Sequence, residues 1–214
     1  MRPHQFPGLK TYRDDRRPWP GVGAALKRGP TVTDVADVER RSAHAVVMLR
    51  LTRAVAAGCA AAPALNAWFD GKERSRRVRK TIDLGVAVDT EDGLFVPVLR
   101  DVGRRTTEDL RDALARLKRD VAARTIPPTE LRGQTITLSN FGTIGGRYAQ
   151  WVVVPPQVAI VGAGRMARQV VAADDAPTIH HQLPLSLTFD HRAVTGAEAA
   201  SFLRAMVADL EQPD

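Results

Sequence analysis

Alternation of apolar and polar residues predicts a series of β-strands along the chain. The clearest run is 183–189, in which every second residue is apolar, the period of a strand with one buried face. A second alternating run, 82–88, is followed by the turn residues at 92–93 and an apolar segment at 94–99, which together predict a β-hairpin. Further strands are predicted at 31–38, 134–139, 152–154, 158–161 and 169–172.

Apolar residues three or four positions apart predict three helices. The first covers 43–61 and ends before Pro63, because proline cannot continue a helix. The second follows Thr106 and the third follows Thr195, since threonine side chains can cap the first turn of a helix. Thr195 and Glu198 also have the spacing of a capping box, in which each side chain bonds the backbone amide of the other. Thr195 is therefore predicted to begin the last helix.

Residues 1–30 differ from the rest of the chain in composition. Their Pro, Gly and Arg content predicts an extended arm with a short helix at 22–27, ahead of one domain at 31–214. With 214 residues, 44% of them hydrophobic, the chain is long enough for a sizeable core. No apolar run reaches the ~18 residues of a membrane span, and the N-terminus lacks the apolar part of a secretory signal. The one cysteine, Cys59, is predicted to be a buried core residue, and these features together predict a cytoplasmic protein.

Positive charge is concentrated in the first part of the chain. The net charge is +7, and residues 1–80 carry 17 Lys and Arg against 7 Asp and Glu. Nucleic-acid-binding surfaces combine such cations with aromatic residues or with a recognisable motif. The densest basic run, 72–80, contains no aromatic residue, so we expect a solvated hairpin there and no nucleic-acid partner.

A histidine lies where the strand at 183–189 gives way to the last helix. Strand ends hold functional side chains on a rigid scaffold, although a lone histidine in a turn is more often structural. Residues 189–196, F-D-H-R-A-V-T-G, resemble the C-terminal signature of dihydrolipoamide acyltransferases, the core components of 2-oxo acid dehydrogenase complexes. Three more blocks resemble this family in the same order: P-A-L-N-A, D-T-E-D-G-L-F-V-P-V, and T-L-S-N-F-G-T-I-G-G followed by P-P-Q-V-A-I-V-G.

The resemblance covers about residues 31–210 and has implications for fold, activity and partners. It implies an α/β (α+β) sandwich similar to chloramphenicol acetyltransferase, with a mixed central sheet flanked by helices. It implies an enzyme that moves an acyl group between the dihydrolipoyl thiol and coenzyme A, both substrates, without a metal. The lipoyl group would arrive on another domain or chain, so the implied partners are a lipoyl domain and the other subunits of such a complex. The basic run would then form a rim that attracts the phosphates of coenzyme A.

Acyl transfer between thiols needs a base that makes the thiolate and a donor that meets the oxyanion of the tetrahedral intermediate. By the resemblance, His191 is the base and Ser139 is the hydroxyl donor. In the family these two residues come from neighbouring subunits of a trimer, which implies a homotrimer with its active site at the interface. Asp190 and Arg192 match the family pattern, and we interpret both as supports that fix the turn around a buried histidine.

Thr195 departs from the family, in which an Asp at this place pairs with an Arg of the first helix. The corresponding segment here, 21–27, has no evident Arg, so both partners are absent together and no buried charge is left unpaired. We therefore expect a structural, capping role for Thr195. The departure also leaves room for an alternative, a catalytically weakened trimeric scaffold. A third possibility is a free-standing acetyltransferase that uses coenzyme A and a small acceptor.

Overall fold

The computed structural model describes residues 29–38, 44–91, 93–173 and 175–212. The predicted helix at 22–27 and all but the last two residues of the predicted arm lie outside the described residues. None of the helices in the described part of the chain is long and apolar enough to cross a membrane.

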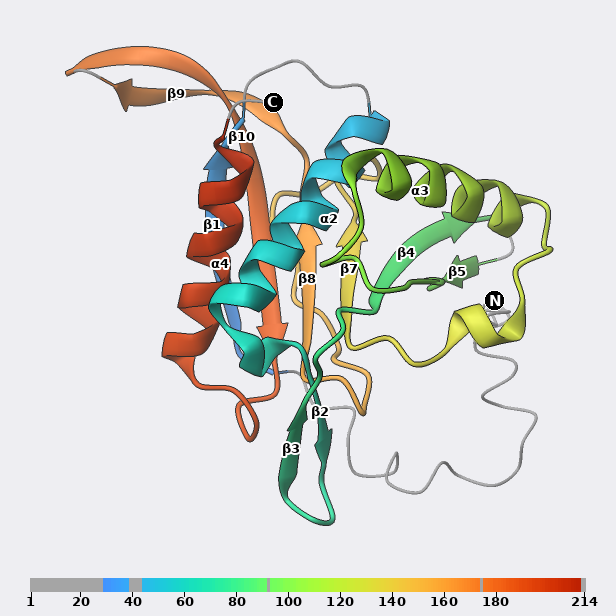
Figure 1. Ribbon diagram of the computed structural model, residues 1–214. Helices are drawn as coiled ribbons and strands as arrows, with labels where there is room; N and C mark the ends of the chain where they lie inside the picture. Colours follow the sequence, from blue (N-terminus) through green and yellow to red (C-terminus); the bar gives the residue numbers. More distant parts are fainter. Residues whose placement is uncertain (1–28, 39–43, 92, 174, 213–214) are drawn as a thin grey trace, which may run out of the picture.

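A mixed sheet of eight strands forms the centre of the described structure (Figure 1). The strand order is β1-β10-β8-β7-β4-β5, with β6 also paired to β4 and β9 also paired to β10. The three central strands β4, β7 and β8 are parallel, and the others are antiparallel to their partners. The strands of this sheet are β1 (Thr31–Asp37), β4 (Leu84–Thr90), β5 (Gly93–Phe95), β6 (Val98–Leu99), β7 (Ile136–Asn140), β8 (Ala159–Ala163), β9 (Ala167–Ala173) and β10 (Ala176–Phe189).

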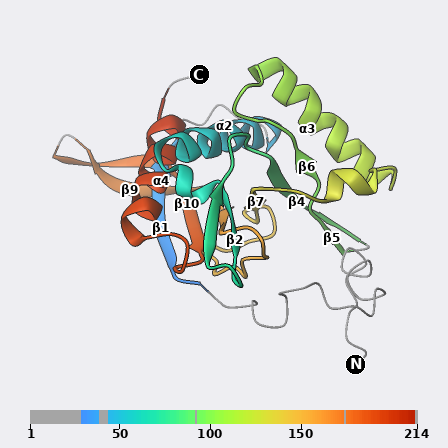
Figure 2. The same cartoon turned by 60° about the horizontal axis from the view of Figure 1, so that its bottom comes forward.

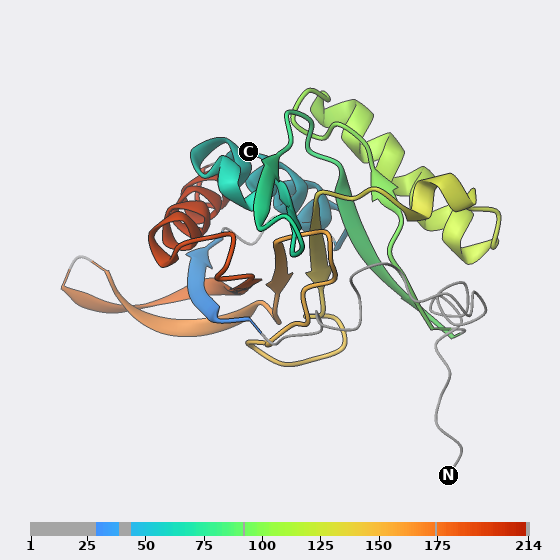
Figure 3. The ribbon, with the colours of Figure 1, turned by 90° about the horizontal axis from the view of Figure 1, so that it is seen from below.

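Helices α2 (His44–Ala61), α3 (Thr107–Ala122) and α4 (Gly196–Leu210) lie on one face of the sheet, as Figure 2 and Figure 3 show from two further directions. The three predicted helices are thus confirmed to within a residue or two. In α3, every third or fourth residue is buried, and the Thr106 side chain accepts a hydrogen bond from the Asp109 amide (3.2 Å), as its predicted capping role requires. Short 3₁₀ turns occur at Pro63–Leu65 and Pro128–Leu131.

The basic run forms the turn and the second strand of a separate hairpin, β2 (Ala67–Asp70) and β3 (Ser75–Val78), which projects beyond the sheet in Figure 1. The predicted hairpin at 72–80 is therefore confirmed as an element. The predicted strand at 94–99 divides into β5 and β6, both paired antiparallel to β4, with Val96-Pro97 between them. Proline cannot donate a ladder hydrogen bond, which accounts for the interruption.

Strand β10 is buried on both faces near its end. Leu185, Leu187 and Phe189 belong to the core that also contains α2 and α4 residues. Ser186 and Thr188 point the other way, yet both are fully buried, because the segment 145–155 crosses that face. Backbone amides of this segment donate to the two hydroxyl oxygens, each at 3.2 Å. The predicted half-buried strand is therefore wrong in one respect: its polar face is covered as well.

The covering segment also explains the one predicted strand that does not form. Residues 152–154 make no strand, although three valines in a row favour one. Their neighbours instead provide the amides that satisfy Ser186 and Thr188, and the backbone follows the face of the sheet. In contrast, β9 and the first half of β10 extend well beyond the predicted 169–172 and 183–189, and form a two-stranded arm that projects from the body (Figure 1).

Candidate active site

The turn between β10 and α4 carries the predicted histidine and is fixed by its neighbours. The Asp190 carbonyl accepts hydrogen bonds from the amides of Ala193 (2.9 Å) and Val194 (3.0 Å). The Asp190 carboxylate accepts from the Arg192 amide (3.0 Å) and from Arg192 Nε at 2.9 and 3.1 Å. This pairing raises the pKa of the Arg192 guanidinium above its ordinary value. In this structure, the two charged residues therefore bind each other and the turn.

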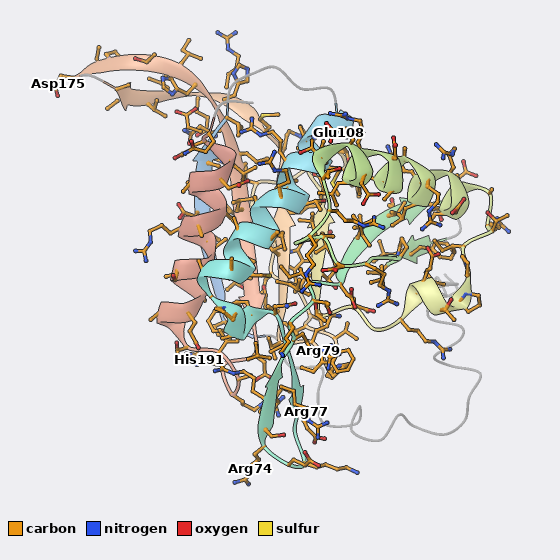
Figure 4. All side chains as sticks on the ribbon, viewed as in Figure 1. Arg74, Arg77, Arg79, Glu108, Asp175 and His191 are labelled. Atoms are coloured by element: carbon orange, nitrogen blue, oxygen red, sulfur yellow. The ribbon has the colours of Figure 1, made fainter. Side chains whose placement is uncertain are left out.

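His191 is exposed in the single chain. Its ring lies 5.5 Å from the Phe189 ring, centroid to centroid, at a tilt of 53°. The predicted burial of this histidine is wrong for one chain, because the turn lies at the outer end of β10. Figure 4 shows His191 at the same end of the molecule as Arg77 and Arg79 of the β2–β3 region.

Ser139 lies near the carboxyl end of β7, opposite Ala87 of β4 and Gly162 of β8. It is 9% exposed. Immediately after it the chain turns sharply: a Cβ on Gly142 would lie 2.3 Å from the carbonyl oxygen of Gly164, so only glycine fits there. Strand β7 therefore ends at this turn.

Ser139 is one of the residues that line a cavity of about 520 Å³ between α3, the ends of β4 and β7, and the segment after β7. Its walls are mainly apolar and include Val86, Val88 and Phe141. Two cations of α3, Arg111 and Lys118, also contribute to the lining. The cavity offers apolar walls beside Ser139, against which an organic group can pack.

His191 and Ser139 do not meet within one chain. Gly162 pairs with Ser139 on one side and with Ser186 of β10 on the other, so these three residues share a row across the sheet. Strands β7 and β10 run in opposite directions (Figure 1), and Phe189 lies three residues beyond this row, away from the end of β7. At about 3.3 Å per residue and about 4.8 Å per strand, the two groups are separated by well over 10 Å.

Thr195 forms the predicted capping box with Glu198. The Thr195 hydroxyl accepts from the Glu198 amide (3.2 Å), and the Thr195 amide donates to Glu198 Oε2 (2.7 Å). This bond from the Thr195 amide is the main cause that lowers the pKa of the Glu198 carboxyl, with smaller contributions from the Thr195 hydroxyl and from Arg76. The predicted capping box at Thr195 is therefore confirmed.

Arg76, on β3, is a residue of this site that no sequence motif indicated. Its Nη1 donates to the carbonyl oxygen of Ala193 and lies 3.2 Å from Glu198 Oε1. A basic run of this kind is expected to be solvated, but this one arginine is engaged with the turn that follows His191. The signal in the sequence that could have pointed to Arg76 is the capping-box residue Glu198, since a carboxylate at the surface attracts a nearby cation.

Among the described residues, no group of three or more His, Cys, Asp or Glu side chains is arranged to hold a metal ion. Cys59 is buried, as predicted, and burial raises the pKa of its thiol to about 12. A thiol of that pKa stays protonated at neutral pH and is a poor nucleophile.

Comparisons with known proteins show the family to which this chain belongs. The family model described as 2-oxoacid dehydrogenases acyltransferase (catalytic domain) matches residues 31–214. A dihydrolipoyllysine-residue acetyltransferase component of the pyruvate dehydrogenase complex of Acholeplasma laidlawii is 33% identical over 175 residues, which are 82% of this chain and 32% of that protein. Relatives from Pseudomonas putida and Rickettsia typhi, 34% and 32% identical, are named as components of branched-chain and 2-oxoglutarate dehydrogenase complexes. The chain spans about a third of the length of the curated relatives it matches.

Solved structures give the same result. A dihydrolipoamide acetyltransferase from Azotobacter vinelandii superposes with a TM-score of 0.80 at 29% identity, over 89% of this chain and 86% of that one. Chloramphenicol acetyltransferase superposes with a TM-score of 0.55 at 14% identity, over 87% of each chain, and so shares the fold. The predicted fold, a mixed sheet flanked by helices in the manner of chloramphenicol acetyltransferase, is confirmed. The family match, the ordered motifs and the shared fold agree. The chain belongs to the 2-oxoacid dehydrogenase acyltransferase family, and residues 31–214 correspond to the catalytic domain of that family.

Proposed function

We propose that this chain transfers an acyl group between the thiol of a dihydrolipoyl group and the thiol of coenzyme A. The observation that carries the proposal is a shared spacing. In the Azotobacter vinelandii enzyme, the serine and histidine studied for their catalytic role are 52 positions apart, and an asparagine follows the histidine by four. Ser139, His191 and Thr195 have the same spacing in this chain.

His191 acts as the base in this proposal. It removes the proton from the attacking thiol, because the thiolate is the reactive form and an ordinary thiol has a pKa of about 8.5. The thiolate sulfur then forms a bond to the thioester carbonyl carbon. When the tetrahedral intermediate collapses, the bond from that carbon to the other sulfur breaks, and the imidazolium returns its proton to the departing thiolate. No other reactant is needed, and no bond to the enzyme forms.

Ser139 donates a hydrogen bond to the oxyanion of that intermediate. The apolar walls of the cavity next to it support this role, because a donor in a site with little water stabilises developing charge most strongly. Exclusion of water also protects the thioester from hydrolysis.

A closed trimer brings the two groups together. One chain holds His191 and Ser139 at opposite ends of its sheet, so a complete site needs His191 of one subunit and Ser139 of its neighbour. A ring with rotational symmetry repeats this contact once per subunit and satisfies every half-site. The exposure of His191 in the single chain supports the proposal, because a catalytic base of this kind must reach beyond its own subunit.

Coenzyme A would approach His191 along the β2–β3 hairpin. Figure 4 shows Arg74, Arg77 and Arg79 there, and clustered cations attract the phosphates of a nucleotide. The dihydrolipoyl group would be carried by a lipoyl domain, which is either another domain of the same protein or part of another chain. The partners of the trimer are then the remaining subunits of a 2-oxo acid dehydrogenase complex.

A weakened scaffold is the second candidate, and Thr195 is the observation that favours it. The two functions are separated by an assay of the purified chain with coenzyme A, free dihydrolipoamide and a set of acetyl, succinyl and branched acyl donors. We expect transfer with at least one donor, and nearly complete loss of transfer in His191→Ala. Activity of His191→Ala within a few-fold of the unmodified chain would show that another base acts, and absence of transfer with every donor would favour the scaffold.

A further inference from the structure

Arg76 connects the β2–β3 hairpin to the turn that follows His191. Its Nη1 donates to the Ala193 carbonyl oxygen and lies 3.2 Å from Glu198 Oε1. Ala193 comes two residues after His191, and Glu198 lies in the first turn of α4. One nitrogen atom therefore contacts both the turn and the start of the helix behind it.

Glu198 extends this contact to Thr195. Its other oxygen, Oε2, accepts from the Thr195 amide (2.7 Å) and from the Thr195 hydroxyl (3.0 Å), which leaves Oε1 to face Arg76. The bond from the Thr195 amide, above all, keeps the pKa of the Glu198 carboxyl below its ordinary value, while burial acts in the opposite direction. Glu198 is thus ionised at neutral pH and forms an ion pair with Arg76.

A second residue of the hairpin contacts the turn from the other strand. The Arg192 guanidinium lies over the Phe69 ring of β2, 4.9 Å from its centroid, and the same guanidinium is bound to Asp190. Phe69 therefore contacts the residue after His191 directly, and the residue before it, Asp190, only through Arg192. Two residues of the hairpin, Phe69 and Arg76, thus contact the turn that carries the histidine.

Exposure indicates what this ion pair contributes. The Arg76 and Glu198 side chains are 34% and 32% exposed, and pairs that water can reach add little to global stability. Their directional bonds to a backbone carbonyl and a backbone amide can nevertheless fix the orientation of the turn. Catalysis is sensitive to such orientation, because a displacement of about 1 Å in a reacting group can cost about a hundredfold in rate.

We infer that Arg76 is a positioning residue for His191, acting through the Ala193 carbonyl and the Glu198 carboxylate. This inference rests on the proposed function, since it requires His191 to be the base. Arg76 itself touches neither substrate nor the reacting atoms in this scheme. Its removal should therefore lower the turnover number and leave substrate binding almost unchanged.

The test compares Arg76→Ala and Arg76→Lys with a matched control, Arg116→Ala, in steady-state assays of the whole chain with coenzyme A and dihydrolipoamide. Arg116 also pairs with carboxylates, at 2.9 Å each, but on α3 and outside the site. We expect Arg76→Ala to lower kcat about tenfold, with KM for both substrates within about twofold. Arg76→Lys should recover most of this loss, because both contacts come from one nitrogen and an ammonium has three donors. Arg116→Ala should retain full kcat.

Each outcome distinguishes this inference from the proposed function. If His191→Ala is inactive while Arg76→Ala keeps kcat within twofold, the inference alone is wrong. If KM for coenzyme A rises at unchanged kcat, Arg76 binds substrate phosphates instead, and the inference is also wrong. If His191→Ala stays active, the proposed function and this inference fail together. Should Arg76→Ala not fold, Glu198→Gln removes the same ion pair from the other side and is expected to lower kcat in the same direction.

Discussion

Two nearly inactive variants should restore each other when they assemble together. In a trimer with shared sites, a Ser139→Ala subunit still supplies His191, and a His191→Ala subunit still supplies Ser139. Random assembly of equal amounts gives an intact His191 with a probability of one half and an intact Ser139 on the neighbour with the same probability. About one quarter of all sites should therefore be complete, and about a quarter of the activity should return.

The need for two subunits follows from the distance between Ser139 and His191 within one chain. Ser139 shares a row with Ser186, and Phe189 lies about 10 Å farther along β10, away from the end of β7. Hydrogen-bonded catalytic groups must approach to about 3 Å of the reacting atoms, so one chain cannot use both of its own residues. The two variants are co-expressed with different affinity tags, doubly purified and assayed for transfer to coenzyme A. Because double purification removes the trimers made of one variant alone, and each mixed trimer has one complete site of its three, the expected activity rises from about a quarter to about a third.

A second experiment uses a double variant that lacks both side chains, Ser139 and His191. It distinguishes a site shared between two subunits from a site within one chain. When the unmodified chain is mixed in equal amounts with a chain lacking both side chains, shared sites leave about one quarter of the sites complete, whereas sites within one chain would leave about one half. Activity of the mixed Ser139→Ala and His191→Ala assembly no higher than the mean of its two parents would refute the shared site.

Other predictions concern single residues. Ser139→Ala should lower kcat by about 10²–10³-fold with little change in KM, as measured by steady-state kinetics, since one oxyanion donor is lost; an unchanged rate would contradict its role. Thr195→Ala should lower the free energy of unfolding by about 1 kcal/mol in denaturant titration, while Thr195→Asn, which also caps, should be tolerated. Thr195→Asp should be tolerated less well, because its carboxylate would face Glu198 Oε2, which lies 3.0 Å from the present hydroxyl. The Cys59 thiol, with its pKa raised to about 12, should resist thiol reagents at pH 8 until the protein unfolds, and rapid labelling of the folded protein would contradict its burial.

Local patterns in the sequence predict the parts of the site that depend on local interactions. The Thr195 capping box needs only residues three positions apart, so the local sequence is enough to predict it. The turn at Asp190 and Arg192 is likewise short, and the resemblance to the family indicates its two supporting residues. The contact of Arg76 with Ala193 joins positions 117 residues apart. No periodicity records such a pairing, since it depends on how the hairpin is placed beside the turn.

The same reasoning explains the corrected description of β10. Alternation correctly locates the strand, because its apolar side chains face the helices. It also suggests a solvated polar face, but Ser186 and Thr188 are covered by backbone from 145–155, which lies more than thirty positions earlier in the chain. A hydroxyl bound to a backbone amide and a hydroxyl bound to water look identical in sequence. The covering segment is recognisable only in the folded chain.

Strand β10 is one element with two very different environments, and this gives it two stabilities. Its first seven residues are exposed or half-buried in the arm, where Val170 and Ile179 are 69% and 55% exposed, while its last seven are buried. Amide protons in the arm should exchange with solvent by local fraying, whereas those of 183–189 should exchange only when the whole domain opens. The arm should therefore open without the rest of the sheet, while the end that leads to His191 opens only with the core.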